Sequence, residues 1–502
     1  MKRVQLFLCS LVAMFMLSAN SAWAQYVKVT DEDGTVSWIE IDGVINGTEI
    51  EIFNSDEGSA IDKNTKGSID LNEVWSRSGG RGTHYQVTSI GDYAFSWCDG
   101  LTSVEIPSSV TSIGSCAFQC CGLTSVVIPS NVTSIGSYAF SDCSFLFSVE
   151  IPSSVTFIGN AAFLNCYRLT SIVIPSSLTF IDGYTFAYCS GLTSIEIPRG
   201  MIMIGLGAFS GCSGLTSIEI PSSVMYIESS AFSGCSGLTS ITIPSSVTSI
   251  GDYAFSGCSG LTSIVVESGN SVYDSRNNCN AIIETATNTL IKGCENTKIP
   301  SSVTSIGVGA FSSCSGMTAI EIPSSVTSIG NSAFYGCLGL TSITSYITDV
   351  FETGNGAFSY CDKATLYVPA GLVSTYQSTA DWSRFSKIEE IPGIALAIAC
   401  NNKGKVKVNG GVQFTNDMGE VSVYDGMEST FTFQPNENCE LRQVLIDGLD
   451  VTRSVENNQL TTKVNEGSKM IVVFDNKGSD VNGDGTVDIS DVVQLVNIIL
   501  GQ

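Results

Sequence analysis

The sequence has 502 residues, of which 43% are hydrophobic and 14% are charged, and its formal net charge at pH 7 is −25. An acidic chain of pI ≈ 4.3 without a basic stripe repels the phosphates of nucleic acid, so we exclude nucleic-acid binding. The single histidine, His84, leaves at most one imidazole for a Ser-His-Asp triad, a Cys–His pair or a His-ligated zinc. We therefore predict a protein that is not an enzyme.

Residues 1–24 have the pattern of a secretory signal, with a basic start, a largely apolar run over residues 4–17, and Ala-Trp-Ala as a cleavage site at residues 22–24. The other apolar runs, 394–399 and 492–500, are too short to span a bilayer. We therefore expect a secreted or cell-surface protein with no membrane span.

Residues 25–85 contain short alternating runs separated by Asp33-Gly34 and Asn46-Gly47, which are dipeptides typical of hairpin turns. We predict a β-structured cap at this end of the chain. The acidic group at residues 31–33 could be read as a metal site, but a hairpin turn with a solvated tip is favoured.

Residues 86–391 are built from near copies of one 23-residue unit, with one step of 22 residues. A fixed period in this range indicates a solenoid, in which each coil buries its apolar groups against its neighbours. The recognisable copies begin at Leu101, Leu123, Leu146, Leu169, Leu192, Leu215, Leu238, Leu261, Met317 and Leu340.

The unit at residues 238–260 reads LTSITIPSSVTSIGDYAFSGCSG. Alternation over residues 238–243 predicts a strand that Pro244 ends, and residues 247–250 predict a second short extended run. The spacing in residues 251–258 suits a single helical or 3₁₀ turn that directs an alanine, a phenylalanine and a cysteine into the core.

The motif L-x-x-I-x-I-P-x-x-V-x-x-I-G-x-x-A-F-x-x-C resembles the BspA-type leucine-rich repeat of bacterial surface and secreted proteins. It departs from the general leucine-rich pattern because Ser246 stands where that pattern has asparagine, so we expect no asparagine ladder. The resemblance implies a binding protein, with adhesion to matrix proteins such as fibronectin and fibrinogen. The expected fold is mainly β: a leucine-rich-repeat solenoid of about a dozen 23-residue coils with an N-terminal β cap, a C-terminal β-sandwich domain and a single calcium loop-helix.

Eleven cysteines share one position of the repeat and should stack at about the strand spacing of 4.8 Å with parallel Cβ vectors, which suits free thiols better than disulfides. Two other pairs, Cys279–Cys294 and Cys400–Cys439, are better candidates for bridges. The eleven are Cys98, Cys121, Cys143, Cys166, Cys189, Cys212, Cys235, Cys258, Cys314, Cys337 and Cys361.

Residues 267–300 interrupt the period. Such an insertion is either a place where a partner binds or a β-hairpin that pads one coil, and the sequence leaves both open. The solenoid is expected to close near residue 391, with Trp382 and Phe385 as a lid over the last coil.

The outward position of the repeat strand carries a row of glutamates that we take as the candidate ligand face. Paired carboxylates could also serve a glycosidase, but that chemistry needs a pocket that raises the pKa of one carboxyl, and an open strand face predicts none. A solvated surface is the simplest alternative. The row comprises Glu105, Glu150, Glu196, Glu219 and Glu321.

Residues 392–476 show alternating runs separated by Gly, Asn and Asp, which predict a small antiparallel β-sandwich. No catalytic constellation is evident in this segment.

Residues 477–502 contain DVNGDGTVDISD, which places oxygen ligands at the spacing of a calcium loop, with Gly485 at the sharp turn. Apolar residues at helical spacing follow the loop. This loop and helix resemble one half of a type I dockerin, which implies a cohesin-like partner, although the second half that dockerins usually carry is missing. The predicted Ca²⁺ ligands are Asp480, Asn482, Asp484, Thr486 through its backbone, Asp488 and Asp491.

Two functions follow from these patterns. The first is an exported, adhesin-like binding protein that engages an extracellular protein of the matrix type or a glycan. The alternative is a component of an extracellular polysaccharide-degrading assembly, tethered through the dockerin-like tail.

Overall fold

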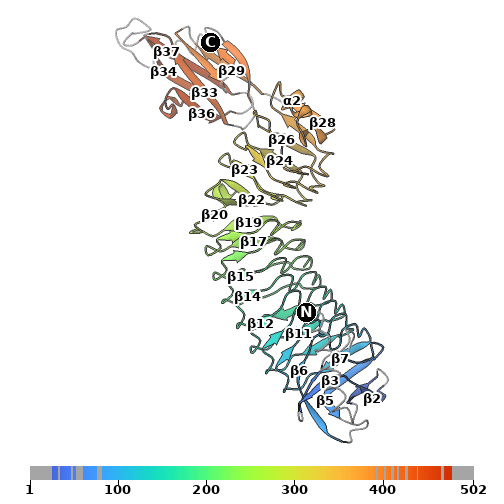
Figure 1. Ribbon diagram of the computed structural model, residues 1–502. Coiled ribbons are helices and arrows are strands. Elements are labelled where there is room, and N and C mark those ends of the chain that lie inside the picture. The colour runs from blue at the N-terminus through green and yellow to red at the C-terminus, as the bar shows by residue number, and fades with distance from the viewer. Residues whose placement is uncertain are drawn as a thin grey trace, which may run out of the picture. The chain divides into compact units, whose positions relative to one another are not determined.

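The computed structural model describes residues 25–31, 34–46, 49–52, 60–75, 82–391, 394–400, 403–408, 412–414, 418–423, 428–437, 439–464 and 468–476 (Figure 1). The predicted signal segment and calcium loop lie outside these residues. The chain divides into two compact units, one ending at Glu389 and one beginning at Glu390. Within the described residues, no helix has both the length and the apolar character needed to cross a membrane.

The first unit is the predicted solenoid of parallel strands (Figure 1). Its first sheet is built from the strand that opens each repeat, in register from coil to coil, as in the pairs Ser148↔Ser125 and Ser148↔Ser171. Two coils contribute only single bridges, at Glu196 and Glu219. The strands are β7 (Leu101–Glu105), β9 (Ser125–Val127), β11 (Ser148–Glu150), β13 (Ser171–Val173), β17 (Ser240–Ile243), β19 (Ser263–Val266), β24 (Ala319–Ile322), β26 (Ser342–Ser345) and β27 (Thr365–Val368).

The second sheet is built from two-residue strands at the end of the second extended run, which is shorter than the run predicted. An isoleucine in each strand points inward, and the residue before it faces outward. The strands are β8 (Ser112–Ile113), β10 (Ser134–Ile135), β12 (Phe157–Ile158), β14 (Phe180–Ile181), β15 (Met203–Ile204), β16 (Tyr226–Ile227), β18 (Ser249–Ile250), β23 (Ser305–Ile306) and β25 (Ser328–Ile329).

The turn that closes each coil is not the helical turn predicted. Tyr253 and Gly257 have φ values of 58° and 71°, in the left-handed region, so the backbone alternates instead of continuing as a helix. The reason is visible in an earlier coil, where the N–H groups of Phe95 and Trp97 donate to carbonyl groups of the next coil at 2.7 Å. The prediction of three inward side chains is confirmed, because the alanine, phenylalanine and cysteine are buried.

The phenylalanines of these turns form a stack through the core. Ring centroids from Phe95 to Phe255 are 5.1 to 5.7 Å apart, with interplanar angles of 14° or less. A second run extends from Phe311 to Phe358. Burying one such side chain contributes roughly 1.5–3 kcal/mol, so the stack is a main source of the coil-to-coil stability.

The cysteines form the predicted internal row. All eleven are buried, and nine of them donate their S–H to the phenylalanine carbonyl of the preceding coil, at 2.8 to 3.2 Å. Burial raises the pKa of the Cys143 and Cys258 thiols to about 12. Serine replaces the absent asparagine ladder, because the Ser246 hydroxyl donates to the Val224 carbonyl at 2.6 Å.

The expected N-terminal cap extends both sheets. Two hairpins form, β1 (Tyr26–Thr30) with β2 (Val36–Glu40), and β3 (Gly43–Asn46) with β4 (Glu49–Ile52). Strand β5 (Gly67–Trp75) pairs in parallel with β7 of the first sheet. Strand β4 pairs in parallel with β6 (His84–Ile90), which leads into the second sheet.

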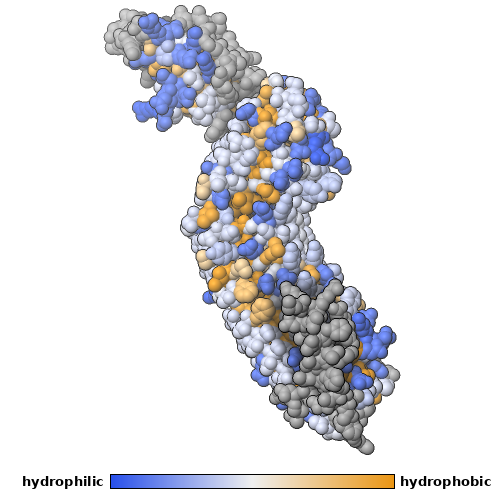
Figure 2. All heavy atoms as spheres, viewed as in Figure 1, coloured by the Kyte–Doolittle hydropathy of each residue, from blue (hydrophilic) through white to orange (hydrophobic). Residues whose placement is uncertain are grey.

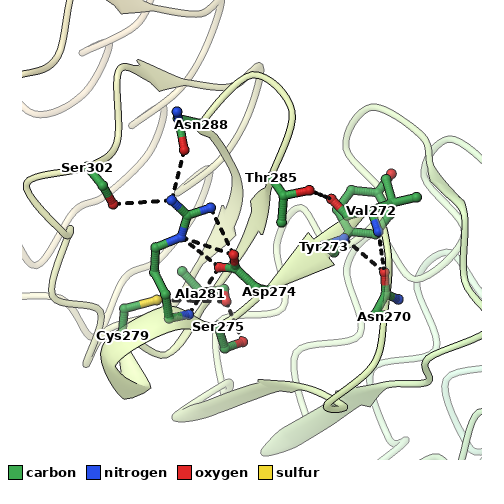
Figure 3. A network of polar contacts seen from close by, with 11 residues as sticks. Asn270, Val272, Tyr273, Asp274, Ser275, Cys279, Ala281, Thr285, Asn288 and Ser302 are labelled. Atoms are coloured by element: carbon green, nitrogen blue, oxygen red, sulfur yellow. Dashed lines mark hydrogen bonds and ion pairs between the residues drawn. The ribbon is translucent and has the colours of Figure 1, made fainter.

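The insertion forms strands β20 (Tyr273–Asp274), β21 (Ala281–Glu284) and β22 (Thr289–Gly293), with the 3₁₀ turn η1 (Arg276–Asn278). Strand β22 pairs in parallel with β23, so the β21–β22 hairpin takes the place of one coil. Arg276 lies at the centre of a polar network, with its guanidinium 2.8 Å from both the Asp274 carboxylate and the Asn288 side-chain oxygen (Figure 3). The structure confirms the hairpin, and partner binding at the insertion stays a prediction.

The lid over the last coil is confirmed. It comprises α2 (Val373–Ser378), η2 (Trp382–Arg384) and β28 (Lys387–Glu390). Trp382 is fully buried, donates its indole N–H to the Phe351 carbonyl at 3.0 Å, and packs 4.7 Å from the ring of Phe358. Phe385 contacts Phe358 from a second direction at 5.3 Å.

The second unit contains two sheets that contribute to one buried core. Every strand pairing described there is antiparallel except β29 with β37, which is parallel, so the all-antiparallel prediction is wrong at that pair. The strands are β29 (Ile394–Cys400), β30 (Gly404–Val408), β31 (Val412–Phe414), β32 (Met418–Val423), β33 (Glu428–Pro435), β34 (Cys439–Ile446), β35 (Leu449–Asp450), β36 (Gln459–Lys463) and β37 (Lys469–Asn476).

Neither of the two predicted disulfides is formed. Cys279 and Cys294 direct their thiols to backbone carbonyl groups, of Ala281 and Asn280 respectively. Cys400 and Cys439 lie on strands that flank β37 on opposite sides, two strand spacings apart, which is wider than a disulfide can bridge.

Candidate binding faces

The predicted glutamate row lies on the outward face of the first sheet. Glu150 is in register with Val127 on one side and Val173 on the other, and the two valines are 72% and 66% exposed. Glu196 and Glu219 are direct register partners, so two carboxylates occupy adjacent coils. The surface is therefore a mixed row of carboxylates and exposed valines.

The remaining members of the row lie toward its ends. Glu105 is in register with Asp70 of the cap strand β5, and Glu321 is in register with Thr344. Thr242 and Val265 hold the same outward position between Glu219 and the insertion. The structure thus brings Glu150, Glu196 and Glu219 onto one continuous stretch of the face and leaves Glu321 beyond the insertion.

A second face was not anticipated from the sequence. In most coils the outward residue of the second sheet is serine, but four consecutive coils carry Phe157, Phe180, Met203 and Tyr226 there. Phe180, Met203 and Tyr226 are register partners on adjacent strands, and Phe157 and Tyr226 are each 40% exposed. Figure 2 shows hydrophobic side chains gathered over the part of the solenoid that carries β14 and β15.

Two of these coils lose a repeated hydrogen bond. In regular coils the threonine before the outward serine donates its hydroxyl to the backbone carbonyl of the equivalent residue of the preceding coil, as Thr133 does to Thr111 at 3.3 Å. Two neighbouring coils instead have Ile202 and Met225, which are 44% and 39% exposed. Apolar side chains have thus replaced hydroxyl groups that bond to the backbone, at positions where they gain no core packing.

The turns present a third surface, on which aromatic residues occupy left-handed positions. Tyr184 and Tyr188 have φ values of 54° and 58° and are 38% and 50% exposed. Their rings lie against Gly207 and Gly211 of the next coil, where any Cβ would collide with them. Glycine in the following coil therefore makes room for each ring.

Elsewhere, the described residues offer few candidates for a catalytic or metal-binding site. His84 bonds through Nε2 to the Asn72 carbonyl at 2.7 Å and packs on Trp75, so it is a structural part of the cap. The described residues contain no group of three or more His, Cys, Asp or Glu that could hold a metal. The six predicted calcium ligands lie outside them.

Parallel coils of this length, with a leading strand in one sheet and a buried phenylalanine and cysteine in the closing turn, define a leucine-rich-repeat solenoid. The family model described as "BspA type Leucine rich repeat region (6 copies)" matches residues 83–193, 181–292 and 289–391, well over half of the chain. The protein therefore belongs to the BspA-type leucine-rich-repeat family.

Several solved structures are similar. A leucine rich cell surface protein from Faecalibacterium prausnitzii A2-165 is 28% identical, with a TM-score of 0.47 over 70% of this chain and 95% of that one. A leucine-rich repeat protein from Bacteroides ovatus ATCC 8483 is 24% identical, with a TM-score of 0.45 over 70% and 98%. The pneumococcal vaccine antigen PcpA is 15% identical, with a TM-score of 0.30 over 72% and 98%. No curated protein matched the sequence.

Proposed function

We propose that this protein is an exported, non-enzymatic binding protein that engages an extracellular protein of the matrix type or a glycan through the first-sheet row. Its membership of the BspA-type family and the secretory pattern of residues 1–24 support export and a surface or extracellular location.

The observation that carries the proposal is the exposure of valine on this row. Over residues 104–322, the inward positions of the first sheet are valine or isoleucine because the core requires them, whereas the outward position varies among glutamate, valine and threonine. Val127 and Val173 expose most of their side chains beside Glu150, and the fold gains nothing from apolar residues there. Apolar groups held on a rigid, exposed strand face are typical of an interaction surface.

The row also limits the ligand. Two unit charges about 4–5 Å apart, as on Glu196 and Glu219, repel by about 1 kcal/mol in water, so an anionic ligand on this stretch would add to the repulsion. Neutral polar or cationic groups suit it better.

The test is a binding screen of the secreted chain against matrix proteins and neutral glycans, repeated with Glu196→Gln plus Glu219→Gln and with Val127→Thr plus Val173→Thr. Each variant changes only outward side chains, so the melting temperature should stay level or rise slightly. We expect binding of the identified ligand to change in both variants. A ligand that binds both variants like the unaltered chain would show that this row is not the site.

A further inference from the structure

We propose that the second-sheet patch, made of Phe157, Phe180, Ile202, Met203, Met225 and Tyr226, binds a protein segment in which apolar side chains are flanked by lysine or arginine. The patch lies on the other sheet from the first-sheet row, so either proposal can fail alone. Its case rests on three departures from the repeat that fall in the same coils.

The first departure is the run of large side chains at outward positions. Phe180, Met203 and Tyr226 occupy in-register positions on adjacent strands, so their side chains follow one another at about the 4.8 Å spacing of a sheet. The flanking register partners, Ser134 beside Phe157 and Ser249 beside Tyr226, return to serine. The apolar run therefore has two defined ends.

The second departure widens the patch. Ile202 and Met225 stand immediately before Met203 and Tyr226, and the Met225 N–H donates to the Ile202 carbonyl at 2.9 Å, so the two residues lie in adjacent coils. Both are substantially exposed. Four neighbouring positions in two coils are thus apolar where the repeat has threonine and serine.

The third departure is charge. The residue after the inward isoleucine of the second sheet is glycine in most coils, but it is Asp182 in the coil of Phe180 and Glu228 in the coil of Tyr226. Each carboxylate directly follows the strand that carries the aromatic residue and lies two positions after it in the chain. Glu228 is exposed, and Asp182 is half-buried, with one oxygen accepting from the Gly183 N–H at 2.7 Å.

Charge complementarity decides the occupant. An apolar strip edged by two carboxylates, on a chain of net charge −25, favours a partner that brings apolar groups together with cations. The same charge opposes a second copy of this chain and opposes an anionic lipid surface. A neutral glycan could donate hydroxyl hydrogen bonds to the carboxylates, but it brings neither the positive charge nor the apolar side chains that match this patch.

The experiment uses the full secreted chain and a short fluorescent peptide in which leucine residues are flanked by lysine residues. Two further peptides replace every lysine by glutamate, or every leucine by serine. We expect the leucine–lysine peptide to bind, and the other two to bind at least about tenfold more weakly, because each lacks one half of the complementarity.

The first variant restores the serine that the repeat itself uses at the outward position. Phe180→Ser with Met203→Ser and Tyr226→Ser should weaken binding of the leucine–lysine peptide by about tenfold or more, while the melting temperature of the solenoid stays unchanged. Asp182→Asn with Glu228→Gln should weaken binding of this peptide several-fold and reduce the salt dependence of binding. Asp349→Asn with Glu352→Gln makes the same charge change at exposed positions near the last coil, outside both faces, and is the matched control, with unchanged binding.

Each contrary result overturns the proposal. Equal binding of the leucine–glutamate peptide, or equal losses in the two charge-matched variants, would show that the acidic groups of the patch select nothing. Unchanged binding by the triple serine variant would show that its apolar groups are idle. A chain that dimerises in the ultracentrifuge, and becomes monomeric in the triple serine variant, would assign the patch to a second copy instead.

Discussion

The regular coils up to residue 266 and the hairpin coil at residues 267–300 differ in the side chains that they bury at the centre of the solenoid. In the regular coils, a stacked phenylalanine and a thiol occupy the centre of every coil. In the hairpin coil, β22 runs straight past the point where other coils turn, and the centre holds Lys292 instead. The buried apolar groups consequently fall into two clusters that meet at this coil.

Lys292 occupies an unusual environment for a cation. Its side chain is 3% exposed, and its Nζ lies 3.8 Å from the Cys314 sulfur. It forms no ion pair with any residue that the structure describes. A cavity of about 50 Å³ lies beside it, bounded on its other sides by the turns at residues 250–256 and 307–309. Among the described strands, β22 pairs with β23 of the following coil and not with β18 of the preceding one, so the second sheet is interrupted at the same coil as the core beneath it.

The largest expected effect comes from the regular region. Phe209→Ala removes a ring stacked on both sides, at 5.6 and 5.5 Å, and should lower the free energy of unfolding by about 3–5 kcal/mol. Phe255→Ala removes a ring stacked on one side only, and its loss should be smaller by about 0.5–1.5 kcal/mol. Urea unfolding measures both. Equal losses would mean that ring stacking adds nothing to burial.

Lys292→Met should act in the opposite direction. Because the ammonium group is buried without an ion-pair partner, an apolar side chain of similar length should raise the free energy of unfolding by about 1–4 kcal/mol. Lys298→Met makes the same change at an exposed position of the same coil and should stay within about 0.5 kcal/mol of the unaltered chain. A loss of stability in the first variant would show that the lysine has a stabilising partner.

High pH should weaken the thiol-containing core. The folded-state pKa of Cys143 and Cys258 is raised from 9.0 to about 12, so their protonated form stabilises the fold fully below pH 9. Above pH 9 the unfolded chain loses these protons first, and stability falls by about 1.4 kcal/mol per pH unit for each thiol until the folded pKa is reached.

Urea midpoints at pH 8 and pH 10.5 test this dependence. The variant Cys143→Ala with Cys258→Ala should show a smaller fall between the two pH values, whereas Cys439→Ala, at a half-exposed position of the second unit, should not change it. A fall of the same size in the first variant and in the unaltered chain would exclude these two thiols as its cause.

The smallest effect on the solenoid is expected from the predicted calcium loop. Asp480→Ala with Asp484→Ala should abolish calcium uptake and calcium-dependent protection of the last residues from protease. The main melting transition should not move, because each coil is stabilised by its own neighbours. Calorimetry without calcium uptake by the unaltered chain, or unfolding of the whole chain on chelation, would contradict this prediction.

The repeat period was sufficient to predict most of the solenoid. Positions that recur every 23 residues identified the inward isoleucines, the stacked phenylalanines and the thiol row, because each must meet its own copy in the next coil. The lid residues Trp382 and Phe385 could also be predicted, since an open end requires apolar cover.

The misses have physical causes. A helical turn was predicted because the spacing of the apolar residues in the closing turn fits a helix. Gly207 and Gly211 are typical of a left-handed backbone, but Tyr184 and Tyr188 occupy the same two positions in the preceding coil, and tyrosine rarely adopts that conformation. The second-sheet patch was not predicted because the repeat motif contains only residues that most copies share. Phe180 and Ile202 depart from that motif, which has serine and threonine at their positions. Lysine is rarely buried, so nothing in its neighbours predicted Lys292.

The pairing of a tyrosine ring with a glycine in the following coil restricts how the array can change its length. The rings of Tyr184 and Tyr188 lie where a Cβ of Gly207 or Gly211 would stand, and Tyr253 likewise lies against Gly309 across the hairpin coil, whereas Tyr138 is followed by the small Ala161. A duplication or deletion that placed the coil of Tyr138 directly after the coil of Tyr184 would make the two tyrosine rings clash. Coils can therefore be copied only together with a compatible follower, which gives the array an internal order and a direction.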